Sequence, residues 1–191
     1  MTRAIHPSVD HGIQKGCSDF GGSTLRCSCT NDPVEVRVDT QVLYNHACGC
    51  TKCRKTKHTL SSVVGVVPSE KVAVTSHREK LKVRDDTALI QRHARTACGT
   101  HLYGRIENKE RAFYGLDFIQ TELSTEAGWD GPGFAPFVSF IIESGNAPSS
   151  MVEVRQTLRE KGLELYDCLS PALIDILAAH SAKAKSTHSE A

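Results

Sequence analysis

The stretch His46-Ala47-Cys48-Gly49-Cys50-Thr51-Lys52-Cys53 contains three thiols in the spacing Cys-x-Cys-x-x-Cys. Three sulfurs so close together on one loop can converge on a single soft cation such as Zn²⁺. A tetrahedral ion with three protein ligands keeps one position free, which distinguishes a zinc site that performs chemistry from a structural one. The stretch therefore predicts an open metal site at Cys48, Cys50 and Cys53.

A second group of cysteines lies on both sides of this stretch. Cys27-Ser28-Cys29 precedes it, and Cys98-Gly99-Thr100-His101 follows it. A structural zinc site needs four ligands, and these two segments offer three thiols and one imidazole. We expect a closed site at Cys27, Cys29 and Cys98, with His101 as its candidate fourth ligand. The alternative is that His101 is a strand histidine hydrogen-bonded to the backbone.

Composition and charge narrow the class of protein. Of the 191 residues, 39% are hydrophobic and 24% are charged, which is typical of one soluble globular domain. The net charge of +1 gives no reason to expect a nucleic-acid partner. The N-terminus lacks the apolar core of a secretory signal, and no apolar run is long enough to cross a membrane. We therefore expect a cytoplasmic protein, where thiols stay reduced and bind metal more readily than they form disulfides.

The hydrophobic pattern divides the chain into four segments. We expect an irregular N-terminal arm at 1–22, a zinc-binding β domain at 23–145, a C-terminal helical region at 146–185 packed on it, and a frayed tail at 186–191. The fold class is mainly β (α+β). Strands are expected at 21–26, 34–38, 60–67, 72–75, 81–83, 88–93, 100–107 and 111–119. The segment 134–142 suits a strand or a helix, and helices are expected at 151–161 and from Ser170-Pro171 onward.

The open site favours chemistry on a thiol. Three thiolates on Zn²⁺ leave a net charge of about −1, so the ion suits a soft fourth ligand better than it polarises a carbonyl. A thiol bound there would lose its proton and attack an electrophile as a thiolate. Nearby cationic side chains could hold the carboxylates of an anionic thiol, or they could form a solvated basic loop. These side chains are Lys52, Arg54, Lys55, Lys57 and His58.

The chain resembles the glutathione-dependent formaldehyde-activating enzymes, the S-(hydroxymethyl)glutathione synthases, over nearly its full length. The resemblance rests on the segments 5–10, 45–53, 90–93, 98–108, 114–118, 163–167 and 169–171, which include Cys98-Gly99-Thr100-His101-Leu102-Tyr103-Gly104-Arg105. The family implies an Mss4-like fold of coiled β-sheets around zinc. It also implies addition of the glutathione thiol to formaldehyde, the entry step of formaldehyde detoxification.

The resemblance assigns roles to both cysteine groups and exposes one departure. Cys48, Cys50 and Cys53 match the catalytic zinc ligands, and Cys27, Cys29 and Cys98 match three of the four structural ligands. The family has Cys-x-x-Cys at the position of Cys98, but the first residue of that pair is Arg95 here. An arginine stays protonated and cannot ligate zinc. The structural site is therefore completed by His101 or water, or it is weakened or empty.

Two kinds of function follow from these features. The leading hypothesis is a zinc-dependent enzyme whose partners are glutathione and formaldehyde, with no nucleic acid and no membrane. Lys52, Arg54 and Arg105 are the candidates for binding the glutathione carboxylates, and Lys52, His46 and Tyr103 are the candidates for protonating the product. The alternatives are a non-catalytic zinc-binding module, or a carrier of glutathione or formaldehyde that binds without turnover.

Overall fold

The computed structural model describes residues 4–169 together with 173, 175 and 179. Its strands form two sheets, one of three strands in the order β1-β2-β5 and one of eight strands in the order β11-β10-β3-β4-β9-β8-β7-β6. The strands are β1 (Ser23–Arg26), β2 (Glu35–Val38), β3 (Leu43–Cys48), β4 (Ser62–Pro68), β5 (Val72–Ser76), β6 (Leu81–Val83), β7 (Gln91–Arg95), β8 (His101–Arg105), β9 (Leu116–Gln120), β10 (Phe134–Ala135) and β11 (Glu164–Leu165). The mainly β prediction is confirmed.

Strand β4 is the centre of the large sheet. Every residue from Ser62 to Val67 is buried, which fits the two pairs of valines on either side of Gly65, because a strand covered on both faces is apolar throughout. It pairs antiparallel with β3 on one side and with β9 on the other. Strands β10 and β11 join the edge of the sheet in parallel. The end of β3 carries Cys48, so the loop that continues through Cys50 and Cys53, here called the metal loop after its predicted role, leaves the sheet beside its most buried strand.

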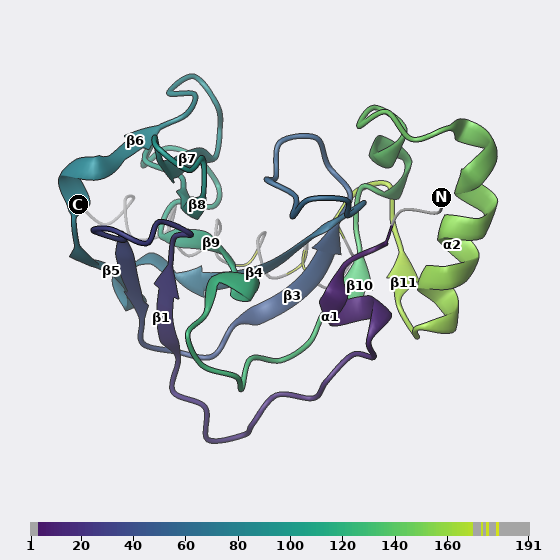
Figure 1. The fold of residues 1–191 in the computed structure, drawn as a ribbon, viewed down its shortest axis with the longest axis horizontal. Helices are drawn as coiled ribbons and strands as arrows, with labels where there is room; N and C mark the ends of the chain where they lie inside the picture. Colours follow the sequence, from purple (N-terminus) through teal and green to yellow (C-terminus); the bar gives the residue numbers. More distant parts are fainter. Residues whose placement is uncertain (1–3, 170–172, 174, 176–178, 180–191) are drawn as a thin grey trace.

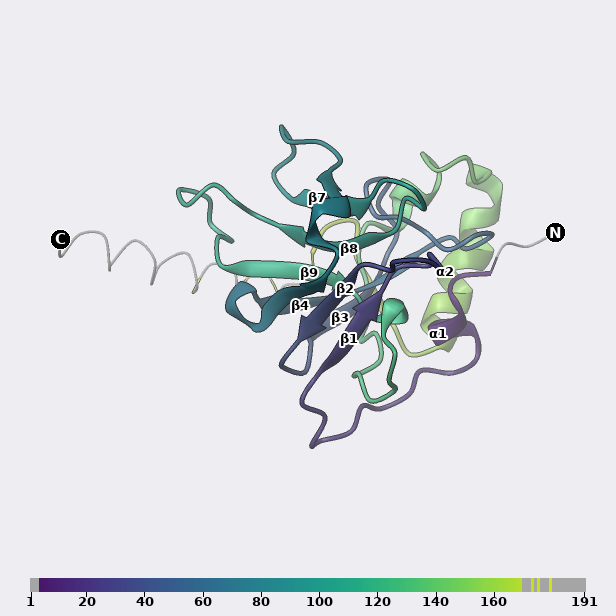
Figure 2. The ribbon, with the colours of Figure 1, turned by 60° about the vertical axis from the view of Figure 1, so that its left-hand side comes forward.

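The small sheet packs against the large one. Strand β2 alternates between half-buried and buried positions, and its buried Val36 and Val38 share a core with Leu102 of β8 and Ile119 of β9. Figure 2 shows the small sheet crossing in front of the large sheet. Cys27, Cys29 and Cys98 lie in or against this core. The second cysteine group therefore lies where the two sheets meet.

A short amphipathic helix packs at the other end of the molecule. Helix α2 (Met151–Glu160) buries Met151, Val154 and Leu158, whose spacing places them on one face, and it stands beside β11 (Figure 1). The chain leaves it through Gly162, whose φ of +80° is the left-handed conformation that glycine favours after a helix. The helix predicted at 151–161 is thus confirmed. The helix predicted from Ser170 falls largely outside the described residues. No helix in the described residues has the length and apolarity needed to cross a membrane.

Several predicted boundaries were wrong. The segment Leu43–Cys48 is a strand that the pattern did not predict, because a bulge at Tyr44 (φ +50°) and the polar Asn45 and His46 interrupt its alternation. The strand expected at 88–93 is Gln91–Arg95, and only the second half of 111–119 is a strand. The segment 134–142 contains the short β10 followed by the 3-10 turn η4 (Val138–Ile141). The arm expected to be irregular contains the one-turn helix α1 (Pro7–Asp10).

Candidate metal centre

Three thiols converge where β3 ends. The Sγ atoms of Cys48, Cys50 and Cys53 all lie within 4.8 Å of one another. Cys50 Sγ is 3.4 Å from Cys53 Sγ, and Cys53 Sγ is 3.8 Å from Cys48 Sγ. Sulfurs that share a tetrahedral zinc ion are about 3.8 Å apart, because each Zn–S bond is about 2.3 Å long. The ligand type, number and spacing therefore fit a zinc ion with one open position.

Neighbouring segments hold this loop in shape. The Gly49 amide donates to the Pro136 carbonyl at 3.0 Å. The Lys55 ammonium donates to the Cys50 carbonyl at 2.7 Å and to Ser144 Oγ at 3.2 Å. Lys55, considered above for binding carboxylates, is therefore bound to the loop itself. The Arg54 carbonyl accepts from Ser62 Oγ and Gln120 Nε2, each at 2.6 Å.

The three thiols shift one another's pKa values. Hydrogen bonds from Cys48 and Cys53 hold the pKa of the Cys50 thiol far below its ordinary range. The same interaction with Cys50 raises the pKa of the Cys48 thiol well above its ordinary range. Of the three thiols, Cys50 therefore loses its proton most readily, and Cys48 is among those that keep theirs. A divalent cation placed among the sulfurs would displace those protons.

The thiols lie in the wall of a cavity of about 540 Å³. The cavity brings together Lys52 and Arg54, two of the residues predicted to bind substrate, with His46 and Tyr103, two of the predicted proton donors. The third predicted proton donor is Lys52 itself. Arg92 of β7 and His101 of β8 line the same cavity. Sequence reasoning did not place Arg92 at the site, since nothing in its neighbourhood along the chain points to the thiols.

Arg105 does not line this cavity. Its Nε donates to Asp117 Oδ1 at 2.8 Å, and its Nη2 donates to Asp117 Oδ2 at 2.5 Å and to the Ser69 carbonyl at 3.3 Å. Asp117 is fully buried, so the pair has a structural role on strands β8 and β9. The structure therefore does not support Arg105 as a substrate-binding residue.

His101 belongs to the thiol cavity and not to the second cysteine group. Burial, together with the charges of Arg92, Arg84 and Arg54, lowers the pKa of His101 to about 4. The imidazole is therefore neutral at physiological pH. Lys52, Arg54 and Arg92 line the same cavity and give this side of it positive charge, as a site for an anionic substrate requires.

The second cysteine group has three members in the described part of the chain. The Sγ atoms of Cys27, Cys29 and Cys98 lie within 4.8 Å of one another, and no histidine or carboxylate joins them. The Val34 amide donates to Cys27 Sγ at 3.2 Å, and Arg95 Nε donates to Cys29 Sγ at 3.2 Å. The three thiols fit three ligands of a zinc ion, but the guanidinium of Arg95 lies beside them at the position where the resemblance implies a fourth thiol. The group does not match a closed four-thiolate site.

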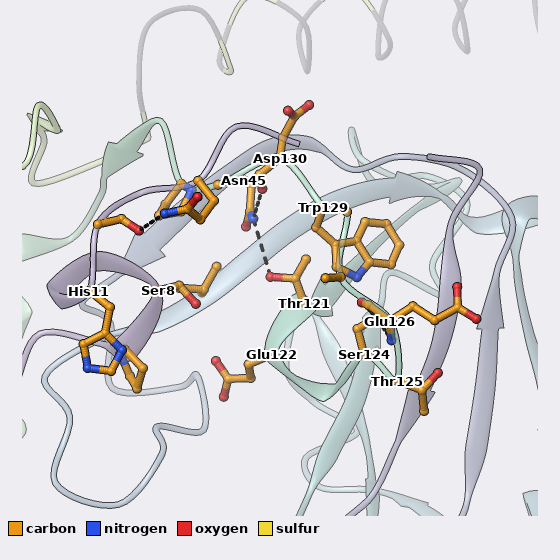
Figure 3. A pocket seen from close by; sticks show the side chains of 18 residues that line it. Ser8, His11, Asn45, Thr121, Glu122, Ser124, Thr125, Glu126, Trp129 and Asp130 are labelled. Carbon is orange, nitrogen blue, oxygen red and sulfur yellow. Dashed lines mark hydrogen bonds between the residues drawn. The ribbon is translucent and has the colours of Figure 1, made fainter. Parts of the chain in front are cut away.

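A second cavity of about 550 Å³ lies on another part of the molecule and contains neither thiol group. Figure 3 shows its polar lining, in which the Asn45 amide donates to the Asp130 carbonyl at 2.6 Å. Trp129 lines this cavity, and its ring meets Phe20 edge to face at 4.7 Å. The only tryptophan therefore lines a pocket, but not the pocket of the thiols. Cys17 and Cys168 are exposed and stand apart from both cysteine groups.

The fold and the site together define a β-sheet protein with two cysteine trios that could each hold a metal ion, one of them open to a cavity. The family model described as glutathione-dependent formaldehyde-activating enzyme matches residues 23–125, which span both trios. The chain belongs to this family.

Two curated relatives agree with this assignment. A protein of Fusarium vanettenii is 53% identical over 183 residues, which cover 96% of this chain and 98% of the relative. A protein of Podospora anserina is 53% identical over 176 residues, which cover 92% of this chain and 82% of the relative. Both carry the name "Putative glutathione-dependent formaldehyde-activating enzyme". Their names support an enzyme that acts on formaldehyde with glutathione.

Proposed function

We propose that the chain is an S-(hydroxymethyl)glutathione synthase, a carbon–sulfur lyase that joins the thiol of glutathione to formaldehyde in the cytoplasm. The observation that carries this proposal is the convergence of the Cys48, Cys50 and Cys53 sulfurs in the wall of an electropositive cavity. Family membership supports the choice of substrates. Removal of formaldehyde from the cell is the physiological role that this reaction would serve.

The three thiols are the proposed ligands of a zinc ion. When bound, zinc lowers the pKa of a coordinated thiol and thus favours its reactive thiolate form. The cavity supplies Lys52, Arg54 and Arg92 for the two carboxylates of glutathione, with the guanidinium groups suited to bidentate pairing. Anchored in this way, the tripeptide would present its sulfur to the loop and leave room for formaldehyde in front of it.

The cavity also contains groups that can move the proton. His46 Nδ1 lies 2.8 Å from the Tyr44 carbonyl, which can only accept, so Nδ1 carries the hydrogen and Nε2 is the acceptor atom. The ring of His46 is held in this orientation by stacking on Phe134 at 5.1 Å. We assign His46 to take the thiol proton and return it to the oxygen of the hydroxymethyl group, with the Lys52 ammonium as the alternative donor.

Exchange NMR with glutathione and formaldehyde tests the proposal. Zinc-loaded wild-type protein should speed the exchange between free formaldehyde hydrate and the hydroxymethyl adduct, while Cys50→Ser should leave the uncatalysed rate. The matched control is Cys17→Ser, which removes an exposed thiol outside both groups and should exchange like wild type. Saturable glutathione binding without faster exchange would indicate a carrier. Neither binding nor exchange would indicate a non-catalytic zinc module, and either result would overturn the proposal.

A further inference from the structure

One side of the thiol cavity is apolar. The apolar wall consists of Leu89, Ile90, Phe113, Phe118, Phe137 and Phe140, and it faces the same space as the metal loop. Its residues come from three separate parts of the chain, so the wall forms only in the folded protein. Leu89 is 52% exposed, so a ligand in the cavity could cover it.

The reaction proposed above gives this wall little to bind. Formaldehyde has a single carbon and carries no apolar substituent. Glutathione is a polar tripeptide whose carboxylates suit Lys52, Arg54 and Arg92 on the cationic side of the cavity. Pockets that bind small molecules use apolar walls to hold apolar parts of the ligand. A cavity of about 540 Å³ with such a wall beside the thiols therefore suits a larger electrophile.

The backbone at Phe137 strengthens this argument. Its φ of 58° and ψ of 38° lie in the left-handed region, which bulky residues rarely adopt. The Gly49 amide donates to the carbonyl of the preceding residue, Pro136, and so fixes the backbone next to Phe137. The Phe137 side chain lines the cavity. Its ring centroid lies 5.7 Å from that of Phe140, with the two rings nearly perpendicular. Unfavourable backbone conformations of this kind cluster at ligand sites.

We propose that this site also takes aldehydes that bear an apolar or aromatic group, with that group packed on Phe137 and Phe140. The inference rests on the proposed function, because it uses the same thiolate. In the step, the thiol sulfur forms a bond to the carbonyl carbon and the C=O π pair moves to oxygen. The thiol proton ends on that oxygen and gives a hemithioacetal, so no oxidant or reductant is needed.

Exchange NMR with three aldehydes tests the inference. The probes are formaldehyde, acetaldehyde and phenylacetaldehyde, each with glutathione and zinc-loaded protein. For each aldehyde the acceleration is the ratio of the catalysed to the uncatalysed exchange rate. In wild type this ratio should be at least as large for phenylacetaldehyde as for acetaldehyde. In Phe140→Ala the ratio of phenylacetaldehyde to formaldehyde exchange should fall by roughly tenfold, the order expected when an apolar contact is lost from a specificity pocket. The control Phe20→Ala, which removes an aromatic ring beside Trp129, should keep the wild-type ratio.

A binding measurement separates specificity from catalysis. Saturation-transfer NMR with 2-phenylethanol, which does not react with thiols, should show transfer to its ring protons in wild type and in Phe140→Leu, with weaker transfer in Phe140→Ala. Acceleration with formaldehyde alone, or an unchanged ratio in Phe140→Ala, would overturn the inference and leave the proposed function standing. Acceleration with phenylacetaldehyde alone would overturn the formaldehyde function instead. No acceleration with any aldehyde would overturn both.

Discussion

Gly49 is the position in the metal loop where the smallest change should have a measurable effect. A Cβ at Gly49 would lie 2.4 Å from the Phe137 carbonyl oxygen and 3.1 Å from Ile141 Cγ1. Ordinary van der Waals contact begins near 3.4 Å, so the loop and the Phe137 backbone must separate by about 1 Å. The contact is with backbone, which cannot rotate away as a side chain can. Gly49→Ala must therefore displace either the thiols or the apolar wall.

The expected cost follows from this displacement. Overpacking of this kind typically costs about 1–3 kcal/mol of unfolding free energy. For a chain of this size each kcal/mol shifts Tm by about 2–4 °C, so Tm should fall by about 2–12 °C. Zinc affinity should fall by roughly 10–100-fold, the usual effect of losing a contact that supports metal ligands. Both effects share one cause, since Gly49 lies between Cys48 and Cys50.

Calorimetry of the zinc-loaded protein and competition with a chromophoric chelator measure the two quantities. The matched control is Gly133→Ala, because a Cβ at Gly133 would meet no atom within 4 Å and its φ lies outside the left-handed region. Gly133→Ala should leave both values at the wild-type level. The reasoning is refuted if Gly49→Ala binds zinc and melts as Gly133→Ala does.

Three further changes test the division of roles among the residues. Cys50→Ser should abolish zinc binding at the open site without changing the far-UV circular dichroism spectrum or the cooperative thermal unfolding. A variant that fails to fold would show that this site, and not the second cysteine group, stabilises the fold. Arg95→Cys should supply a fourth thiol beside Cys29 and so raise the zinc content, measured by elemental analysis, and the Tm in zinc-replete buffer; an unchanged zinc content would contradict this. Asp117→Asn should weaken the buried pair with Arg105 and cost about 2–3 kcal/mol by denaturant unfolding, less than for a fully buried pair because Arg105 is partly exposed. The glutathione affinity of Asp117→Asn, measured by calorimetric titration, should match that of wild type. Weaker binding would show that Arg105 takes part in glutathione binding.

The sequence was most informative where one local pattern determines the outcome. Helix α2 followed from the spacing of Met151, Val154 and Leu158 and from Gly162. The trio of Cys48, Cys50 and Cys53 followed from its short spacing, and the second trio from adding the distant Cys98 to the pair Cys27 and Cys29 to fill a zinc site. The structure brings the sulfurs of each trio together.

Long-range pairing could not be predicted in the same way. His101 follows Cys98 at a ligand-like spacing, but β8 begins at His101 and the structure places this residue in the wall of the other cavity. Arg105 looked available for substrate because its partner Asp117 lies on the neighbouring strand, in a register that the sequence does not reveal. The apolar wall was missed for the same reason, since its residues are adjacent only after folding.

The metal loop depends on contacts that are distant along the chain. The hydrogen bond to the Arg54 carbonyl comes from Gln120, which is synthesised 66 residues later. The hydrogen bond from the Lys55 ammonium goes to Ser144, which is synthesised 89 residues later. At ribosomal speeds of about 5–20 residues per second, roughly 4–18 s separate the synthesis of Lys55 from that of Ser144. During that interval the Lys55 contact that holds the thiol loop cannot form. Given the proposed zinc site, we expect zinc supply and reducing conditions during translation to raise the yield of folded protein.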